Sequence, residues 1–390
     1  MRAFRHLKRL DWVLFAAVLA LCLYGLVMIY SATRGAEASG WAAPSQYAKK
    51  QVLWLLVSLF AFFLTVLFDY RSLARWHLPI YLIVTALLVL VLKVGRSPTG
   101  ATCWIALGGL RLQPSELAKI AVILSIAAFV ARRSESVTKM GVVGRSLAIA
   151  MAPVILVLGQ PDFGTALVII AIWFGALYFA GARGRHLALV LACGLALFAG
   201  MWNLGKIPEA RLRSPLDKVI AAARLREYQK RRLTIFLNPQ ADPTGAGYQV
   251  IQSRIAIGSG QLFGRGPSHS TQGRLHFLPE QRTDFIFSVV GEELGFVGCF
   301  TMLALFFFVY WRGLRIALRA KDPLGSLLAA GAVTMLAFHT LVNIGMSVNL
   351  MPITGIPLPF VSYGGSNLLA SFLAFGLLQN VRMRRDSVIF

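Results

Sequence analysis

Acidic residues are scarce in this chain of 390 residues, which has 16 Asp and Glu against 39 Lys and Arg and a formal net charge of +23. Charged residues of both signs make up only 14% of the chain and hydrophobic residues 57%, and the mean hydropathy is +0.67. So few charges exclude a single water-soluble domain and are typical of a polytopic membrane protein. The basic residues lie between apolar runs, where membrane topology and anionic headgroups explain them, so we expect no nucleic-acid partner.

Cysteine and several common catalytic motifs are also scarce or missing. The cysteines have no short paired spacing, and three of them lie in apolar runs, so neither a zinc site nor a disulfide framework is indicated. They are Cys22, Cys103, Cys193 and Cys299. The chain has no glycine-rich phosphate loop of the P-loop type and no His/Glu metalloprotease pattern.

Apolar runs predict an all-α polytopic membrane domain of about ten transmembrane helices that occupies residues 1–390. The runs lie near 11–31, 51–68, 77–94, 115–132, 146–160, 164–181, 186–204, 284–311, 325–350 and 360–381. The fifth run is short. Lys and Arg are enriched in the alternate short segments that include both termini, so we place both termini in the cytoplasm. We expect no cleavable signal peptide, because the basic N-terminus precedes a run long enough to span.

One long loop, 205–283, separates the seventh and eighth runs and is predicted to lie outside. Its portion 206–236 is basic and amphipathic, which predicts one or two helices lying on the outer membrane surface. Its portion 238–283 is rich in turn residues, which predicts a segment that folds against the membrane domain without long helices.

The end of this loop places an acid at the entrance of the eighth run. Asp284 directly precedes the apolar residues, beside Arg282 and Glu280. A carboxylate at the boundary of water and lipid usually has a partner or a task. Position alone allows two interpretations: Asp284 caps the following helix, or it is a catalytic group.

Further polar residues interrupt the apolar runs. Glu116 and Lys119 are three residues apart, so they share a helix face and are either a structural ion pair or substrate contacts. Asp162 lies in a very short turn between the fifth and sixth runs. For His339 and Asn343 we expect hydrogen bonds between helices.

The outer end of the last two runs is broken by three prolines and by the turn from Ser362 to Ser366. Broken backbone at membrane depth is tolerated where it is buried in protein or lines a cavity. We therefore predict that this turn, Glu116, Lys119, Asp162 and Asp284 converge on one outward-facing cavity, with Ser362 and Ser366 among the substrate contacts.

An enzyme on the outer face has no ATP or nucleotide-sugar available, so a group transfer there needs an activated donor that arrives through the membrane. A group linked to lipid pyrophosphate fits apolar walls, basic residues for the phosphates and one carboxylate as base. Basic residues near the cavity mouth are predicted to contact the phosphates. They are Lys49, Lys50, Arg111, Lys119, Arg254 and Arg282.

A set of motifs spread over nearly the whole chain resembles the SEDS family, the shape, elongation, division and sporulation proteins. The motifs are QPSELAK at 113–119, QPDFGT at 160–165, DPTGAGY at 242–248, QSRIAIGSG at 252–260, FLPE at 277–280, TDF at 283–285, EELG at 292–295 and PLPFVSYGGS at 357–366. The resemblance is strongest to rod-shape-determining members. It implies a peptidoglycan glycosyltransferase that polymerises lipid II and works with a class B, PBP2-like penicillin-binding protein in the elongation machinery.

The resemblance also assigns roles. The family's essential aspartate falls on Asp284, and its paired acid and base in the fourth helix fall on Glu116 and Lys119. Asp284 is then expected to be the general base that activates the acceptor sugar's 4-hydroxyl. Cations or a divalent metal such as Mg²⁺ or Mn²⁺ are expected to neutralise the leaving pyrophosphate, and neither a cofactor nor a metal ligand is assigned. Two positions depart from the family pattern: Cys103 replaces an arginine, and 281–282 reads Gln-Arg instead of Arg-His.

Three other interpretations stay open at this point. The chain is a division-type member of the family, a lipid II flippase or transporter, or a scaffold without activity of its own. For the partner's single anchoring helix we predict a groove lined by small residues of the eighth and ninth helices. These residues are Gly291, Gly295, Gly298, Gly325, Ala329, Ala330 and Gly331.

Overall fold

The computed structural model describes residues 8–33, 44–94, 103–107, 110–204, 227–243, 245–269 and 280–385. The first part of the predicted surface helices, 206–226, and the FLP sequence at 277–279 lie outside the described residues.

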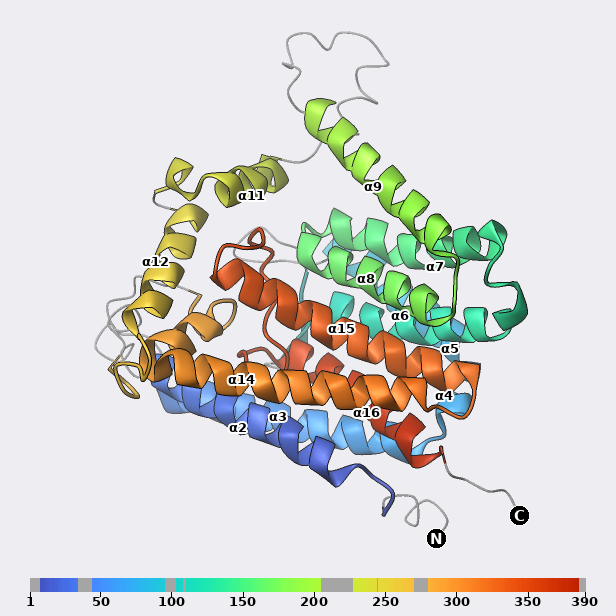
Figure 1. The fold of residues 1–390 in the computed structure, drawn as a ribbon, viewed down its shortest axis with the longest axis horizontal. Helices are drawn as coiled ribbons and strands as arrows, with labels where there is room; N and C mark the ends of the chain where they lie inside the picture. Colours follow the sequence, from blue (N-terminus) through green and yellow to red (C-terminus); the bar gives the residue numbers. More distant parts are fainter. Residues whose placement is uncertain are drawn as a thin grey trace.

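The described residues form a bundle in which ten helices coincide with the ten predicted apolar runs (Figure 1). They are α2 (Trp12–Thr33), α3 (Pro44–Leu67), α5 (His77–Val94), α6 (Pro114–Ala131), α7 (Met140–Gly159), α8 (Phe163–Phe179), α9 (Gly184–Leu204), α14 (Ile286–Leu318), α15 (Pro323–Ser347) and α16 (Gly365–Met383). Seven of these are long and apolar enough to cross a membrane. In α5 and α8 the apolar stretch is shorter, His77–Lys93 and Phe163–Phe179. The predicted multi-pass membrane architecture is therefore confirmed. The fifth helix is not short: α7 has 20 residues, because it begins at Met140, before the apolar run.

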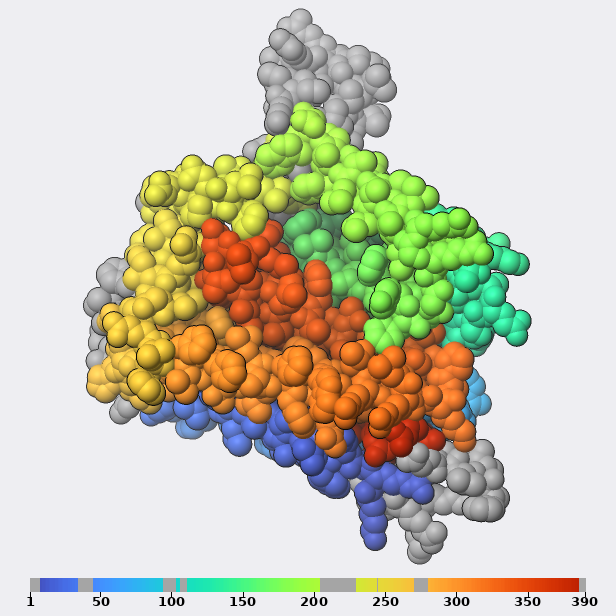
Figure 2. Space-filling model, viewed as in Figure 1, coloured from blue at the N-terminus to red at the C-terminus, as the bar shows by residue number. Residues whose placement is uncertain are grey.

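Helices α6 and α15 form the centre of the bundle. In the most apolar 18-residue window of each, 78% and 72% of the residues are buried, against 6% for α9, which projects from the bundle in Figures 1 and 2. Hydrogen bonds attach α16 to its neighbours: Gln379 exchanges bonds of 3.0 Å with the backbone of Asp11, and Asn380 Nδ2 donates to the carbonyls of Thr65 and Phe68. Because buried amides need partners, these bonds favour one register between α2, α3 and α16.

Several short elements connect the helices. The short helix α4 (Tyr70–Arg75) lies between α3 and α5, and an antiparallel pair, β1 (Ile105–Leu107) and β2 (Leu110–Leu112), precedes α6. Two 3₁₀ turns are η2 (Ser134–Ser136) and η4 (Pro239–Ala241).

The described part of the long loop contributes two helices, α11 (Glu227–Leu237) and α12 (Ala246–Ser259), which lie at one end of the bundle (Figure 1). The prediction that 238–283 lacks long helices was wrong, because α12 has 14 residues. Its inner face is held by Ser253, whose hydroxyl lies 2.6 Å from Ser288 Oγ and 2.7 Å from the Ser347 carbonyl. Packing on α14 and α15 thus stabilises a helix whose flanking glycines suggested turns.

Helix α14 is interrupted at Gly295, which has φ 64° and ψ −158°. The amides of Phe296 and Val297 donate to the carbonyls of Gln261 and Leu262 at 2.8 and 3.1 Å. A Cβ at Gly295 would lie 2.4 Å from the Gly264 nitrogen. Glycine is therefore required here by both its conformation and the close approach of two backbones.

The small residues predicted to form a partner groove pack against this chain's own elements instead. Ala329 is fully buried, and a Cβ at Gly331 would contact Ile123 of α6 at 3.1 Å. A Cβ at Gly298 would likewise lie 3.1 Å from Tyr24 Oη of α2. The groove prediction was therefore wrong. The outer face of α14, which crosses the front of Figure 2, carries large apolar side chains. They are Phe296, Phe300, Leu303, Phe307, Trp311, Leu314 and Leu318.

Candidate active site

A cavity of about 320 Å³ collects the polar residues that the sequence singled out. Its walls come from the residues around β1, the start of α6, the turn between α7 and α8, helix α11, the turn before α14, the segment 354–364 and the start of α16. Glu116, Asp162, Asp284 and Ser366 all line it. The predicted convergence is confirmed for these four residues and for the broken segment.

Asp284 lies in the turn that leads into α14, and its side chain is half-buried. The N-cap of α14 is Phe285, and no side chain caps that helix, so the capping interpretation of Asp284 was wrong. The backbone of Asp284 is fixed by Asn343, whose Nδ2 donates to the carbonyls of Asp284 and Ile356 at 2.8 and 2.7 Å. Hydrogen bonds between helices were predicted for Asn343, but its side chain bonds instead to backbone outside the helices and so positions this turn.

The surroundings of Asp284 make it a suitable proton acceptor near neutral pH. Burial, with a smaller contribution from the Glu280 carboxylate, raises the pKa of Asp284 from 3.8 to about 7. The Arg232 guanidinium and a hydrogen bond from Thr283 act in the opposite direction, toward a lower pKa. A carboxylate with this pKa is substantially ionised at neutral pH and is also a far stronger base than an ordinary aspartate.

A fully buried ion pair lies below the cavity. Lys119 Nζ is 2.8 Å from Glu116 Oε2 and 2.8 Å from His339 Nε2. Because a lysine ammonium only donates, His339 Nε2 accepts, and Nδ1 carries the ring proton toward the Pro357 carbonyl at 3.5 Å. Glu116 lines the cavity but Lys119 does not. The three side chains therefore link α6, α15 and the broken segment.

Asp162 holds the wall of the cavity together. Its Oδ1 accepts from the Thr165 amide at 3.0 Å and so caps α8. Its Oδ2 accepts from Gln113 Nε2 at 2.9 Å and from the Ser115 hydroxyl at 3.2 Å. One carboxylate thereby joins the starts of α6 and α8 at the cavity surface.

The two predicted serines differ in position. Ser362 does not line the cavity: its hydroxyl donates to the Thr283 carbonyl at 2.6 Å and accepts from the Leu358 amide at 2.8 Å. It braces the turn that carries Asp284. Ser366 lines the cavity, accepts from the Gln113 amide at 3.0 Å and donates to the Arg111 carbonyl at 3.1 Å.

The basic residues predicted at the cavity mouth do not line the cavity. Lys49 and Lys50 on α3, Arg111 on β2 and Arg254 on α12 have exposed side chains. Arg282 is half-buried, with its guanidinium 4.3 Å from the centre of the Tyr47 ring.

Two cavity residues were missed by sequence reasoning. Arg232 on α11 lines the cavity, and its Nη1 donates to the Thr354 carbonyl at 2.9 Å; its only sequence signal was the basic, amphipathic character of the segment. Asn367 on α16 is 4% exposed and also lines the cavity. Within the described residues, neither polar atom of its side chain has a hydrogen-bond partner. Nothing in the sequence distinguished Asn367 from a core residue.

Cys103 is buried in the cavity wall, where its thiol donates to the Gln160 carbonyl at 2.9 Å. This wall thus has a neutral side chain at the position where the resemblance to the SEDS family led us to expect an arginine. In the part of the chain that the structure describes, no three His, Cys, Asp or Glu side chains are grouped to hold a metal ion.

Known proteins of one family are similar to this chain over nearly its whole length. Residues 11–387 match the FtsW/RodA/SpoVE family, described as "Cell cycle protein". Peptidoglycan glycosyltransferase MrdB of Escherichia coli K12 is 35% identical over 376 residues, which are 96% of this chain and 94% of that protein. Probable peptidoglycan glycosyltransferase FtsW of Trichlorobacter lovleyi is 36% identical over 96% of this chain and 94% of that protein. A chain in the solved structure "Structural coordination of polymerization and crosslinking by a peptidoglycan synthase complex" has a TM-score of 0.75 and 33% identity, covering 97% of this chain and 99% of that one.

Proposed function

This chain belongs to the FtsW/RodA/SpoVE family of cell cycle proteins, and on that premise we propose that it is a peptidoglycan glycosyltransferase that polymerises lipid II into glycan strands. The single observation that supports this best is Asp284, a carboxylate with no capping role, in a cavity and with a pKa of about 7. The reaction takes place at the outer face of the cytoplasmic membrane and serves cell elongation.

In the proposed reaction Asp284 accepts the proton of the acceptor sugar's 4-hydroxyl. The hydroxyl oxygen forms a bond to the anomeric carbon of the donor as the bond to undecaprenyl pyrophosphate breaks, which inverts that carbon. General-base catalysis of this kind contributes about 10²–10⁴-fold. The leaving pyrophosphate needs neutralisation of charge more than it needs a proton, so a single carboxylate is sufficient.

Arg232 is the cation best placed to bind the pyrophosphate, because it lines the same cavity as Asp284. A guanidinium forms charge-assisted, bidentate bonds with phosphate oxygens. A divalent ion bound with the substrate would supply further charge neutralisation there.

The remaining predicted contacts divide into two groups. Glu116, Asp162, Ser366 and Asn367 are proposed to touch the sugars or the phosphates directly, because they line the cavity. The exposed basic residues are proposed to attract the polyanionic headgroup from a distance, a contribution that salt screens. They are Lys49, Lys50, Arg111, Arg254 and Arg282.

We further propose that both termini are cytoplasmic and that 205–283 and the cavity face the outside. The enrichment of Lys and Arg in the segments on the side of the termini supports this orientation. A class B penicillin-binding protein of the PBP2 type is the proposed partner that crosslinks the new strands. The solved peptidoglycan synthase complex supports such a pairing, and the exposed apolar face of α14 offers contact area for its anchoring helix.

A division role is the second candidate, since the FtsW relative is as similar as the MrdB relative. A fluorescent fusion separates the two roles: an elongation enzyme follows the side wall and supports rod shape, whereas a division enzyme gathers at the septum.

Purified protein incubated with labelled lipid II tests the activity. Wild type is expected to produce glycan polymer, and Asp284→Asn to lose at least about 100-fold of the rate while it keeps its thermal unfolding profile. Glu135→Gln, which removes an exposed carboxylate that does not line the cavity, is the control and should retain activity. Polymer at near wild-type rate from Asp284→Asn would overturn the catalytic assignment. Leaflet exchange without polymer would indicate a flippase, and neither activity would indicate a scaffold.

A further inference from the structure

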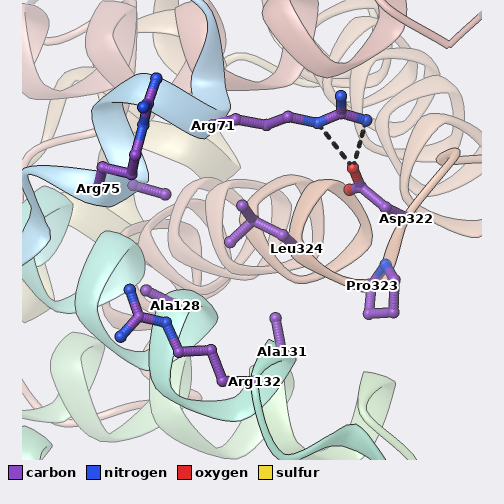
Figure 3. Close-up of a pocket in the computed structure, with 9 residues that line it drawn as sticks. Arg71, Arg75, Ala128, Ala131, Arg132, Asp322, Pro323 and Leu324 are labelled. Carbon is purple, nitrogen blue, oxygen red and sulfur yellow. Dashed lines mark hydrogen bonds and ion pairs between the residues drawn. The ribbon is translucent and has the colours of Figure 1, made fainter.

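A second cavity, of about 380 Å³, lies at the other end of α6, the helix whose start lines the candidate active site. It is lined by Arg71, Ala74 and Arg75 of α4, by the end of α6 and by the start of α15 (Figure 3). Helix α6 begins beside the active-site cavity and ends here after 18 residues, a length of ~27 Å at 1.5 Å per residue. This length is close to the thickness of the hydrocarbon core. The second cavity therefore lies at the opposite membrane interface.

The cavity contains three guanidinium groups and one carboxylate, Asp322. Both oxygens of that carboxylate already accept hydrogen bonds from this chain. Its Oδ2 accepts from Arg71 Nε and Nη2 at 3.1 and 2.8 Å and from the Tyr70 hydroxyl at 2.9 Å. Its Oδ1 accepts from the Gly325 amide at 2.7 Å, as the cap of α15. Asp322 therefore neutralises Arg71 and has no capacity for a second cation.

Arg75 and Arg132 carry the uncompensated charge. In Figure 3 both lie across the cavity from Asp322. Arg75 Nη2 donates to the neutral Ser72 hydroxyl at 2.9 Å. Neither guanidinium forms an ion pair with an acidic residue in the described ranges. Within the described residues, two positive charges thus share one concave site without an acidic partner.

The rest of the lining is apolar. Ala74, Ala128, Ala131, Pro323 and Leu324 form the surface between the guanidiniums. A soluble phosphate would gain nothing from these side chains, whereas a lipid would place its glycerol and first methylene groups on them. Basic pockets between transmembrane helices are a recurrent site for anionic headgroups.

We propose that this cavity binds the headgroup of an anionic phospholipid. Arg75 and Arg132 hold the phosphate oxygens through charge-assisted bonds, and the acyl chains leave over the alanines toward the bilayer. An excess of two positive charges favours a headgroup that has no amine of its own over a zwitterionic one. A bound lipid joins α4, α6 and α15, and α6 and α15 also carry Glu116, Lys119 and His339 beneath the active site. The site does not depend on the proposed polymerase activity.

The test uses the full-length protein in detergent, without lipid II. Bound lipid is counted by native mass spectrometry, and thermal unfolding is followed during titration with phosphatidylglycerol, phosphatidylcholine or inorganic phosphate. The test variant is Arg75→Gln/Arg132→Gln, which changes two exposed side chains. The control is Lys139→Gln/Arg145→Gln, which removes two exposed charges at the start of α7, on the same side of the bundle and outside the cavity.

We expect wild type and the control to bind phosphatidylglycerol at least about tenfold more tightly than phosphatidylcholine. The test variant should bind phosphatidylglycerol about 10- to 30-fold more weakly than wild type, since each basic residue near the membrane surface contributes about fivefold. Unchanged binding by the test variant overturns the proposal. An equal loss in the control, or equal stabilisation by inorganic phosphate, overturns it as well.

Discussion

Replacing Lys119 by Met is expected to destabilise the protein by about 3–5 kcal/mol, because it leaves a buried carboxylate without its counter-charge. Glu116 is 3% exposed and Lys119 is 0% exposed, and their charged atoms are 2.8 Å apart. Glu116→Gln should cost a similar amount, since only the neutral acceptor His339 then remains beside the ammonium. The double variant Glu116→Gln/Lys119→Met removes both charges and should fall within about 1 kcal/mol of wild type.

Thermal unfolding of the three purified variants in the same detergent measures this order. Unfolding of a membrane protein is often irreversible, so the comparison rests on rank at a fixed scan rate. Lys139→Gln is the control, because the Lys139 side chain is exposed and substitutions at such surface positions usually change stability by no more than about 0.5 kcal/mol. If the double variant is no more stable than either single variant, the argument from burial is refuted.

The same variants distinguish a structural pair from a substrate contact. Glu116 lines the active-site cavity, so the double variant should stay inactive toward lipid II although its stability is restored. A double variant that regains polymerisation would show that the pair only neutralises itself, and would remove Glu116 from the substrate contacts.

Two further predictions concern the cavity. Only the ionised form of Asp284 accepts a proton, so the polymerisation rate should rise with pH through about 7 and fall by about tenfold per unit below it. Glu280→Gln should move the midpoint to lower pH and Arg232→Gln to higher pH, and a pH–rate profile unmoved by both would contradict the assignment. Asn367→Ala should raise KM by about two- to tenfold, because it removes one or two neutral hydrogen bonds to the substrate. It should not lower the thermal stability, because the Asn367 amide has no hydrogen-bond partner among the described residues. A lower unfolding temperature with unchanged KM would instead make Asn367 structural.

The membrane helices could be predicted because length and hydropathy are properties of single segments. Each apolar run became a helix, and the errors occurred where packing or capping decides the structure. Helix α7 begins six residues before its predicted start, at Met140. The 14 residues of α12 depend on contacts with α14 and α15 that no local pattern shows.

The convergence of Glu116, Asp162 and Asp284 was also predictable. Charged side chains and broken backbone at membrane depth are tolerated only where protein buries them or where they line a cavity. The roles within one motif were not. Ser362 and Ser366 are four residues apart in the same turn, yet one braces the backbone of Thr283 and the other faces the cavity. That difference depends on which side of the turn packs against its neighbours.

The position of Arg232 in the cavity wall could not be predicted either, because it depends on how α11 packs. Ile235 is buried in a small cluster with Val250 and Ile353, and this contact sets the rotation of α11. Successive residues on a helix point about 100° apart, so Arg231 and Arg232 lie on either side of the line through Ile235. Arg231 consequently reaches Asp242 at 2.9 Å, whereas Arg232 reaches Thr354 and the active-site cavity. A sequence in which both arginines look alike cannot show which one faces the cavity, because the rotation of α11 is set by a tertiary contact of Ile235, three residues beyond Arg232.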